Sequence, residues 1–412
     1  MILPKYEKMY DNFINRYEEI HVCPWHEMSK EQTEALYLGY ISNNDVLDDY
    51  QYYYMANYIV TRLSGISDAH TTVNLKNTGS FPYLFKIIDG EVFVVGVFDE
   101  EELLLSKLVS INGIDINKII AEIANIIPCG NEGWLRFKVE NFLPSIGNML
   151  SLPSLHGEPA ITYNFIDKNG NRVDKEYNTY EKFYRKTNKR IDIPIRHDNL
   201  YFEFNGDAIY FVYNSCLNDA CVNMKKVLDE LDFHLLNGHY NRFIIDLRNN
   251  AGGNSNNNLP IIDFLKRHDE LEIITLTNNA TFSSGRFMYE ALRNLGTIAI
   301  GEEPGTPINA FGNVYIKEKE DNRKRRKQGL EQIQSTIVHK ISSRYFYFDE
   351  EYKLHIAMSK KEYDDMPNAW KITDFNPPDI EIKPTLEDYI NNRDSVMEYA
   401  IKGEYNKVNK ER

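Results

Sequence analysis

The stretch FIIDLRNNAGGN, residues 243–254, decides the fold class of this chain. Its first half is a continuous apolar run, which is typical of a strand that is buried on both faces of a sheet. Two adjacent glycines, Gly252 and Gly253, follow the strand, and glycine permits positive φ angles and the close approach of another backbone. Amide groups exposed at such a turn can hold a negatively charged oxygen. A plain turn is the simpler interpretation of the glycine pair taken alone.

Strands and helices alternate on both sides of this stretch. Helical periodicity follows each apolar run, so we predict strands at residues 208–213, 242–247, 272–277 and 297–300, and helices at 222–236, 258–266 and 283–295. This order predicts an α/β fold in which parallel strands are joined by right-handed crossovers. Reactive groups in such sheets gather at the carboxyl ends of the strands.

A serine stands where the strand at 272–277 leads into the next helix, in the segment Thr281-Phe282-Ser283-Ser284-Gly285. Serine at the start of a helix has an ordinary role as an N-cap. A nucleophilic serine would gain from the same position, because the free NH groups of the helix N-terminus stabilise a developing negative charge. The residues alone leave both roles open.

Together, three segments resemble the tail-specific and C-terminal-processing peptidase family, which includes the tricorn core protease. They are Asp246-Leu247-Arg248 with the glycine pair, the segment 281–285, and Ile300-Gly301-Glu302-Glu303-Pro304. The resemblance implies that Ser283 is the nucleophile and that the NH groups of Gly252, Gly253 and Ser284 form the oxyanion hole. It also implies a crotonase/ClpP-like parallel-sheet core and no metal or other cofactor. Arg286 departs from the pattern, because many relatives have Glu there.

The resemblance also points to the base. Many members of the family use a lysine in a Phe-Gly-Lys-Gly context after the Gly-Glu motif, but residues 305–312 contain no lysine. The tricorn-like branch uses a histidine from the N-terminal part of the chain, in an Asp-Gly-His-Thr type of segment. This chain has Ser67-Asp68-Ala69-His70-Thr71, which implies that His70 is the base. A neutral imidazole within reach of the hydroxyl is what the chemistry requires.

The third catalytic residue should be a carboxylate that fixes the tautomer of the imidazole. The resemblance suggests an acid late in the catalytic domain, and Asp374 is our first choice. Asp379 is the reserve, although aspartates near proline also form turns. Asp68 is a further possibility, but a residue two before the histidine more often shapes the loop.

The rest of the chain divides by texture. Residues 1–78 have helical periodicity and carry the His70 segment, so a helical domain is predicted there. Residues 79–135 look like a PDZ-like module, with a hairpin at 83–97, a strand, an Asn112-Gly113 turn and a helix from Ile116. Such a module takes an extended chain as an added strand, but this one has no clear carboxylate-binding signature. Residues 136–198 look like a connector, and 199–412 form the peptidase core.

Bulk properties exclude several classes of function. The 412 residues exceed the size at which one hydrophobic core usually stops growing, so several domains are expected. A formal net charge of -14 opposes nucleic-acid binding, which needs clustered Lys and Arg. The one basic run, residues 323–327, follows an acid-rich stretch, and this mixed-sign setting predicts a solvated loop.

Compartment and redox state follow from other features. No apolar run approaches the ~20 residues that span a bilayer, so no membrane span is expected. The four cysteines form no CxxC pair and no metal-like cluster with His, so free and mostly buried thiols are expected. The first residues lack the pattern of a signal peptide, so we expect a cytoplasmic protein, or an exported one if a signal peptide was removed.

The sequence therefore predicts a serine endopeptidase or oligopeptidase, a hydrolase that acts on a peptide or protein substrate. The alternative is a non-catalytic peptide- or ligand-binding protein on the same fold, since a fold does not fix an activity. The natural substrate and the oligomeric state stay open.

Overall fold

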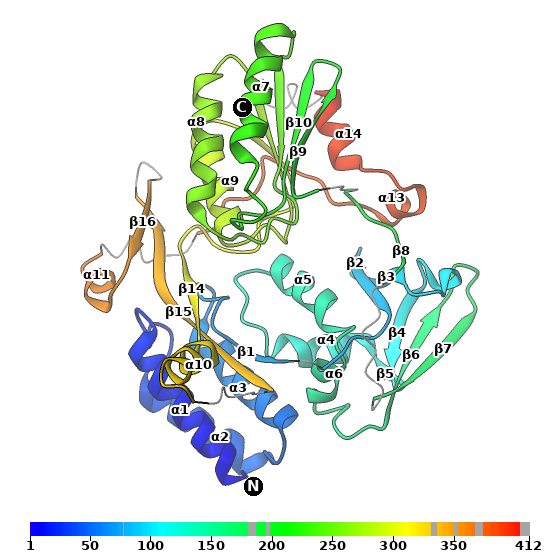
Figure 1. Ribbon diagram of the computed structural model, residues 1–412. Helices are drawn as coiled ribbons and strands as arrows, with labels where there is room; N and C mark the ends of the chain where they lie inside the picture. The colour runs from blue at the N-terminus through cyan, green and yellow to red at the C-terminus, as the bar shows by residue number, and fades with distance from the viewer. Residues whose placement is uncertain are drawn as a thin grey trace. The chain divides into compact units, whose positions relative to one another are not determined.

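A computed structural model describes residues 1–76, 78–179, 187–194, 198–330, 336–349, 353–366 and 374–403. The chain forms two compact units, each built from segments that are discontinuous in sequence (Figure 1). Unit 1 contains Met1–Arg190, Asn309–Phe346 and Ile356–Lys371, and unit 2 contains Ile191–Ile308, Tyr347–His355 and Ile372–Arg412. Both units combine helices with sheets, which confirms the predicted α/β class.

Unit 2 is built on a six-stranded sheet with the order β17-β13-β12-β11-β10-β9. Its strands are β9 (Leu200–Asn205), β10 (Ala208–Tyr213), β11 (Arg242–Asp246), β12 (Glu272–Thr277), β13 (Ile298–Gly301) and β17 (Ile380–Glu381). β10 to β13 and β17 are parallel, as predicted, whereas β9 pairs antiparallel with β10. β9 was not predicted from the sequence, and its burial is only partial.

Helices cover both faces of this sheet. Alternate residues of β10 belong to two different hydrophobic clusters: Ile209 and Phe211 pack with α7 (Met224–Asn237), α8 (Leu259–Arg267) and α9 (Ser284–Asn294). Tyr210 and Val212 pack on the other face with α14 (Ser395–Lys402), which follows α13 (Leu386–Asn391). Burial on both faces explains why these strands are continuous apolar runs.

Unit 1 begins with helices α1 (Pro4–Ile20), α2 (Lys30–Asn43) and α3 (Asp49–Ser64), as the periodicity predicts. They are followed by β1 (Thr72–Leu75), which pairs antiparallel with β15 (Ile337–Phe348). β15 also pairs with β14 (Ala310–Ile316) and β16 (Leu354–Ala357). A sheet that joins β1 to a strand more than 260 residues later was not predicted.

A seven-stranded sheet completes unit 1, with the order β2-β3-β4-β6-β7 and with β5 and β8 beside β4 and β3. Its strands are β2 (Tyr83–Ile88), β3 (Glu91–Val97), β4 (Lys107–Ile111), β5 (Ile114–Asp115), β6 (Ala160–Ile166), β7 (Arg172–Asn178) and β8 (Lys189–Arg190). Its helices are η1 (Glu101–Leu103), α4 (Ile116–Ala124), α5 (Glu132–Phe142) and α6 (Ile146–Ser151). Because β6 pairs with β4, the sheet extends beyond residue 135 into the region expected to be a connector. The predicted domain boundaries themselves stay predictions.

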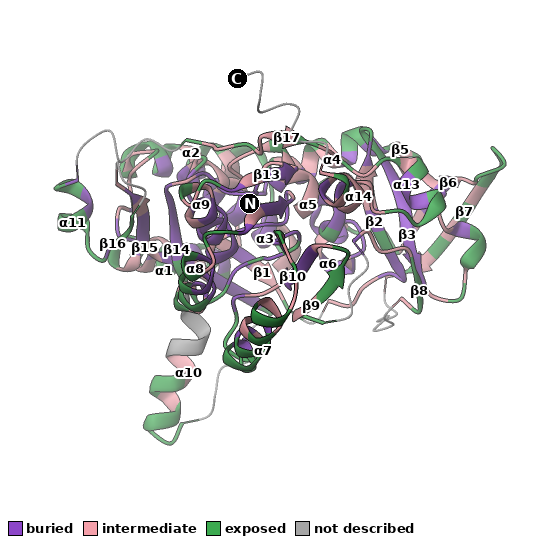
Figure 2. Ribbon diagram, turned by 90° about the horizontal axis from the view of Figure 1, so that it is seen from above, coloured by how far each residue is buried: buried purple, intermediate pink, exposed green. Residues whose placement is uncertain are grey.

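The basic run is helical and not the predicted loop. Residues 323–327 form the end of α10 (Lys317–Lys327), and most of them are exposed (Figure 2). Lys, Arg and Glu are good helix formers, so a charged run without Gly or Pro favours a solvated helix over a loop. A second short helix, α11 (Lys360–Asp364), follows β16.

The described residues bear on two further expectations. None of their helices has the length and apolar character of a membrane span. Cys216 and Cys221 are buried free thiols, while Cys23 and Cys129 are partly exposed.

Candidate active site

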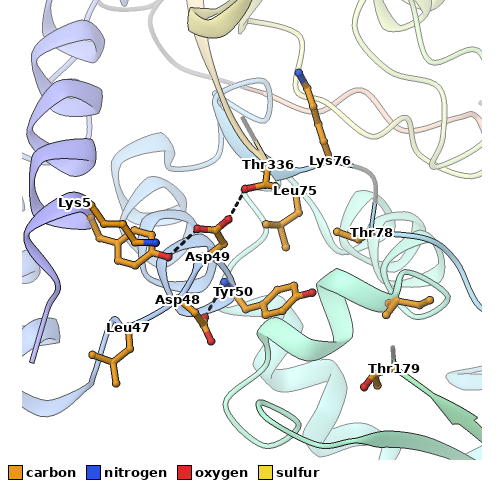
Figure 3. A pocket seen from close by; sticks show the side chains of 12 residues that line it. Lys5, Leu47, Asp48, Asp49, Tyr50, Leu75, Lys76, Thr78, Thr179 and Thr336 are labelled. Atoms are coloured by element: carbon orange, nitrogen blue, oxygen red, sulfur yellow. Dashed lines mark hydrogen bonds between the residues drawn. The ribbon is translucent and has the colours of Figure 1, made fainter. Parts of the chain in front are cut away.

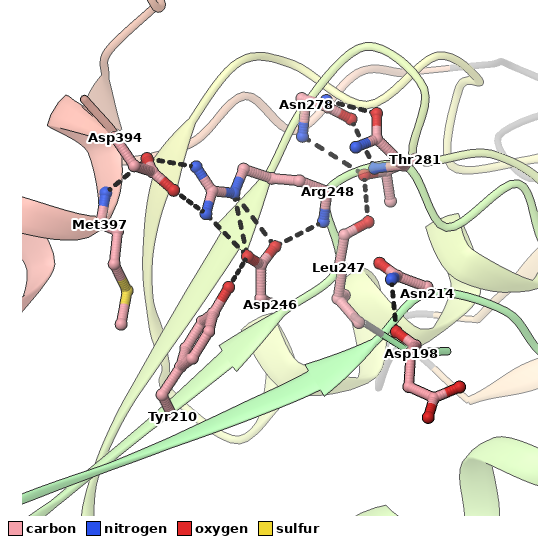
Figure 4. A network of polar contacts seen from close by, with 11 residues as sticks. Asp198, Tyr210, Asn214, Asp246, Leu247, Arg248, Asn278, Thr281, Asp394 and Met397 are labelled. Atoms are coloured by element: carbon pink, nitrogen blue, oxygen red, sulfur yellow. Dashed lines mark hydrogen bonds and ion pairs between the residues drawn. The ribbon is translucent and has the colours of Figure 1, made fainter. Parts of the chain in front are cut away.

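The carboxyl end of β11 is fixed by a buried ion network (Figure 4). Arg248 bonds Asp246 through Nη2 at 2.7 Å and both oxygens of Asp394 at 2.7 and 2.8 Å, and the hydroxyl of Tyr210 donates to Asp246 at 2.6 Å. Burial disfavours the charged guanidinium, but the two carboxylates outweigh it and hold the pKa of Arg248 well above its usual value. Asp246 and Arg248 therefore anchor the strand end and the start of α14.

Two buried asparagines join this strand end to the serine segment. Asn250 donates to the carbonyl of Tyr213 at 2.7 Å, and its own carbonyl accepts from the NH of Phe282 at 2.9 Å. Asn258 donates to the carbonyl of Ser284 at 2.9 Å and accepts from the hydroxyl of Tyr213 at 3.0 Å. Neither residue was predicted to belong to the site, although Asn250 stands two residues before the glycine pair, which is a visible signal.

The glycine pair packs directly against the serine segment. Gly252 has φ 94°, and a Cβ there would lie 2.8 Å from the Cβ of Ser283 and from the nitrogen of Ser284. Gly253 has φ 144°, and a Cβ there would lie 2.4 Å from the carbonyl carbon of Cys216. Only glycine fits either position. The structure thus brings together the three residues that the resemblance assigns to the oxyanion hole.

The amide groups of these residues differ in what they bond. The NH of Gly252, a buried residue, donates to Oδ1 of Asn250 at 3.0 Å. Among the described residues, the NH groups of Gly253 and Ser284 have no acceptor. Gly253 is an exposed residue. The amides of Gly253 and Ser284 therefore differ from that of Gly252, whose NH is bonded and whose lack of a side chain allows the close approach.

Ser283 has a strained backbone, with φ 52° and ψ -122°. It precedes α9 directly, yet its side chain makes no capping hydrogen bond within the described part of that helix. The neighbouring Ser284 is only 3% exposed, and its hydroxyl donates to the carbonyl of Gly253 at 2.9 Å. Strained residues of this kind cluster at functional sites. Of the two serines, Ser283 is the more exposed, and Ser284 is held in the packing.

The positive charge of Arg286 is paired by an acid on the same helix. Arg286 and Glu290 are both fully buried on α9, one helical turn apart, and form an ion pair at 2.7 Å. The ring of Tyr289 lies 4.9 Å below the guanidinium, and Asn376 donates to Glu290 at 3.1 Å. Because a buried charge is costly unless it is paired, Glu290 compensates the Arg that stands where relatives have Glu.

The two late aspartates have different surroundings. Asp374 is exposed, and its backbone carbonyl accepts from the NH of Ile308 at 2.7 Å. Asp379 bonds both terminal nitrogens of Arg293 and accepts from the NH of Ala299 at 2.8 Å. Asp379 therefore connects α9 to β13, whereas the backbone of Asp374 is fixed and its side chain faces solvent.

His70 lies in unit 1, in a loop between α3 and β1, and is partly buried. Burial lowers the pKa of its imidazole to about 4, with further lowering by the charges of Lys138 and Lys340. Asp68 and a backbone hydrogen bond with Phe311 oppose this shift. The imidazole is therefore neutral at neutral pH, which is the state that a general base requires.

Asp68 shapes the His70 loop. Its Oδ1 accepts from the NH groups of His70 at 3.1 Å and Thr71 at 3.0 Å and from the hydroxyl of Ser342 at 2.7 Å. Its Oδ2 pairs with Nε2 of His21 at 3.1 Å. Burial disfavours ionisation, but these bonds outweigh it and hold the pKa of Asp68 well below its usual range. The carboxylate thus fixes the loop through the backbone of His70.

Ser283 and His70 belong to different units, so their pairing stays a prediction. The described residues contain no group of three His, Cys, Asp or Glu side chains placed to hold a metal ion.

A separate pocket of about 580 Å³ lies within unit 1 and contains none of the predicted site residues (Figure 3). The two aspartates that line it, Asp48 and Asp49, form hydrogen bonds with neighbouring residues of the fold. Asp49 accepts from the hydroxyls of Tyr6 and Thr336, and Asp48 caps α3 and bonds His156 at 2.8 Å.

Comparisons with known proteins address the fold. No family model matches the sequence, and no curated protein matches it. Among solved structures, the chain is similar to mature CPAF with a TM-score of 0.59 and 10% identity, over 96% of this chain and 98% of that chain. A structure of mature CPAF complexed with lactacystin gives a TM-score of 0.58 and 10% identity, over 95% and 97% of the two chains. The photosystem II D1 C-terminal processing protease gives a TM-score of 0.44 and 10% identity, over 93% of this chain and 94% of that chain. Along nearly its whole length, this chain shares the fold of mature CPAF.

Proposed function

We propose that the chain is a serine peptidase of the tail-specific and C-terminal-processing kind, with Ser283 as nucleophile and His70 as base. The observation that carries this proposal is the strained backbone of Ser283 against Gly252, next to two amides without a described acceptor. The fold that we propose for this peptidase is a crotonase/ClpP-like core with a PDZ-like module. The likeness to the fold of CPAF supports it.

The reaction follows from the groups available. The neutral imidazole of His70 takes the proton of Ser283 Oγ as that oxygen attacks the peptide carbonyl. The NH groups of Gly253 and Ser284 stabilise the resulting oxyanion, and the N-terminus of α9 adds to this field. His70 then gives the proton to the leaving amine. A water molecule, deprotonated by His70, then attacks the acyl-enzyme; the bond to Ser283 Oγ breaks, His70 returns the proton to that oxygen, and the second product leaves as a carboxylic acid.

Asp374 remains our choice for the acid that stabilises the charged imidazole. Among the three candidates, Asp379 is engaged with Arg293, and Asp68 is engaged with the loop backbone and His21. The exposed carboxylate of Asp374 is held by no described side chain. Asp374→Asn should lower kcat and leave the fold intact.

A fluorophosphonate probe tests the proposal. We expect covalent labelling of Ser283 in the wild type, no labelling in Ser283→Ala and reduced labelling in His70→Ala. Ser42→Ala, at an exposed position near the end of α2, is the control and should be labelled at Ser283 like the wild type. Lactacystin, which a CPAF structure contains, is a second ligand to test for protection of Ser283. If folded protein is not labelled at neutral or mildly alkaline pH, the non-catalytic peptide-binding alternative is favoured.

A further inference from the structure

A second histidine, His21, has no part in the proposed mechanism and is fully buried. It follows the last residue of α1, and the NH of Cys23 donates to its Nδ1 at 3.1 Å. The ring proton therefore lies on Nε2, which donates to Oδ2 of Asp68 at 3.1 Å. The side chains of His21 and Asp68 both have 0% exposure. Because both ring nitrogens are used within the fold, His21 cannot itself be a base for a substrate.

Aromatic side chains hold the His21 ring in one orientation. The ring of His26 lies parallel to it, with the two centres 5.3 Å apart, and the rings of Tyr17 and Phe311 have their centres 4.9 and 4.7 Å away. The NH of Phe311 donates in turn to the carbonyl of Ser67, which begins the segment that carries His70. Packing thus aims the Nε2 donor at Asp68.

Asp68 transmits this donor to the loop of the proposed base. Its Oδ1 accepts from the NH groups of His70 and Thr71 and from the hydroxyl of Ser342, while His21 supplies the bond to Oδ2. A fully buried carboxylate stays charged and in place only while donors compensate its desolvation. Without His21, Asp68 would turn or take up a proton, and either change alters the acceptor of the His70 amide.

We propose that His21 is a positioning residue for the base: its bond to Asp68 holds the backbone of the loop in the conformation in which His70 acts. This inference rests on the proposed function, because it takes His70 as the base. It differs from an ordinary role in the core, since the loss of a core residue lowers stability without changing kcat of the folded protein.

Three variants separate the donor of His21 from its ring. His21→Gln keeps an NH donor that can replace Nε2, His21→Asn carries the same amide on a chain one methylene shorter, and His21→Phe keeps the ring without a donor. We expect kcat to fall by about a hundredfold in His21→Phe and His21→Asn, with KM unchanged, because the base is displaced and the substrate is not. His21→Gln should recover most of that loss.

The matched control is a second histidine–aspartate pair of unit 1. Nε2 of His156 lies 2.8 Å from Oδ2 of Asp48, which caps α3. His156→Phe breaks this pair as His21→Phe breaks the other, and it should keep the wild-type kcat. Urea titration of each variant gives its folded fraction, to which kcat is normalised, so that a loss of stability alone does not count as an effect.

A double variant tests whether His21 acts through His70. In His70→Ala the base is absent, so adding His21→Phe should not slow the fluorophosphonate labelling of Ser283 any further. If the two losses multiply, His21 acts on the site in another way and the positioning role is wrong.

The outcomes of these tests are distinct from those of the proposed function. Absence of labelling in the wild type contradicts the peptidase proposal itself. If the wild type is labelled and all the His21 variants keep its kcat, only the positioning role is overturned. A His21→Gln variant as impaired as His21→Asn also overturns it. If His21→Phe does not fold by circular dichroism, the comparison of Gln with Asn still decides the question.

Discussion

The turn that carries Ser283 and the loop that carries His70 are both held from behind by buried polar groups, but by different forces. Behind Ser283, neutral asparagines and a glycine fix the backbone by hydrogen bonds and close packing. Behind His70, an ionised carboxylate bonded to His21 and Ser342 does the same work. The first region should therefore respond to added volume, and the second to charge and pH.

The largest effect should come from adding one methyl group behind the nucleophile. In Gly252→Ala the new Cβ meets the carbonyl oxygen of Phe282, the Cβ of Ser283 and the nitrogen of Ser284, each at 2.8 Å. We expect kcat/KM to fall by about a thousandfold, the loss typical of a damaged oxyanion hole.

The control for this substitution is Gly206→Ala. Gly206 also has a positive φ, 61°, but a Cβ there meets nothing within 4 Å. Gly206→Ala should lower the free energy of unfolding by about 1 kcal/mol and leave kcat/KM unchanged. Equal losses of activity in both variants would show that backbone strain, and not packing against Ser283, matters.

The second effect concerns the charge behind His70. Asp68→Asn removes charge-assisted bonds to a fully buried carboxylate, so the free energy of unfolding at neutral pH should fall by about 3 kcal/mol. Because the pKa of Asp68 is lowered by folding, this contribution is complete above its unfolded pKa of about 4. It is lost as the pH falls below that value. Urea titrations of both proteins at several pH values measure it, with the exposed Asp89→Asn as control.

The third effect concerns the uncharged Asn250 behind Ser283, in contrast to the charged Asp68 behind His70. Asn250→Ala should lower the free energy of unfolding by about 2 kcal/mol, because it leaves the carbonyl of Tyr213 and the NH of Gly252 without their partner. The loss should be the same across the pH range in which the Asp68→Asn difference changes. Asn256→Ala, at an exposed position, should have no effect. A pH-dependent loss in Asn250→Ala would contradict the distinction between the two regions.

The smallest expected effect is on the pH dependence of kcat/KM, which should be set by the His70 region. The imidazole of His70 must be neutral to act as base, so kcat/KM should rise through about pH 4 and be level by neutral pH. If kcat/KM instead rises with a midpoint near pH 6.5, the ordinary pKa of histidine, the imidazole is not buried. Lys138→Met removes a nearby positive charge, so it should move the midpoint to higher pH.

The sequence predicted those parts of the molecule that depend on neighbouring residues. The strand at 208–213 and the glycine turn follow from local apolar pattern and glycine chemistry, and the structure contains both. The pairing of β1 with β15 and the bond from Ser342 to Asp68 could not be predicted, since the partners are more than 260 residues apart in each case. The roles of Asn250 and Asn258 depend in the same way on contacts that only the folded chain creates.

The antiparallel pairing of β1 with β15 has a consequence for biosynthesis. A nascent polypeptide that has been translated as far as residue 330 already contains Ser283 and the glycine turn, but Ser342 has not yet been made. Asp68 then lacks one of the bonds that shape the loop of the base. On the proposed mechanism, a nascent chain that stops short of Ser342 is therefore an unfinished enzyme on the ribosome, even though its nucleophile has already been made.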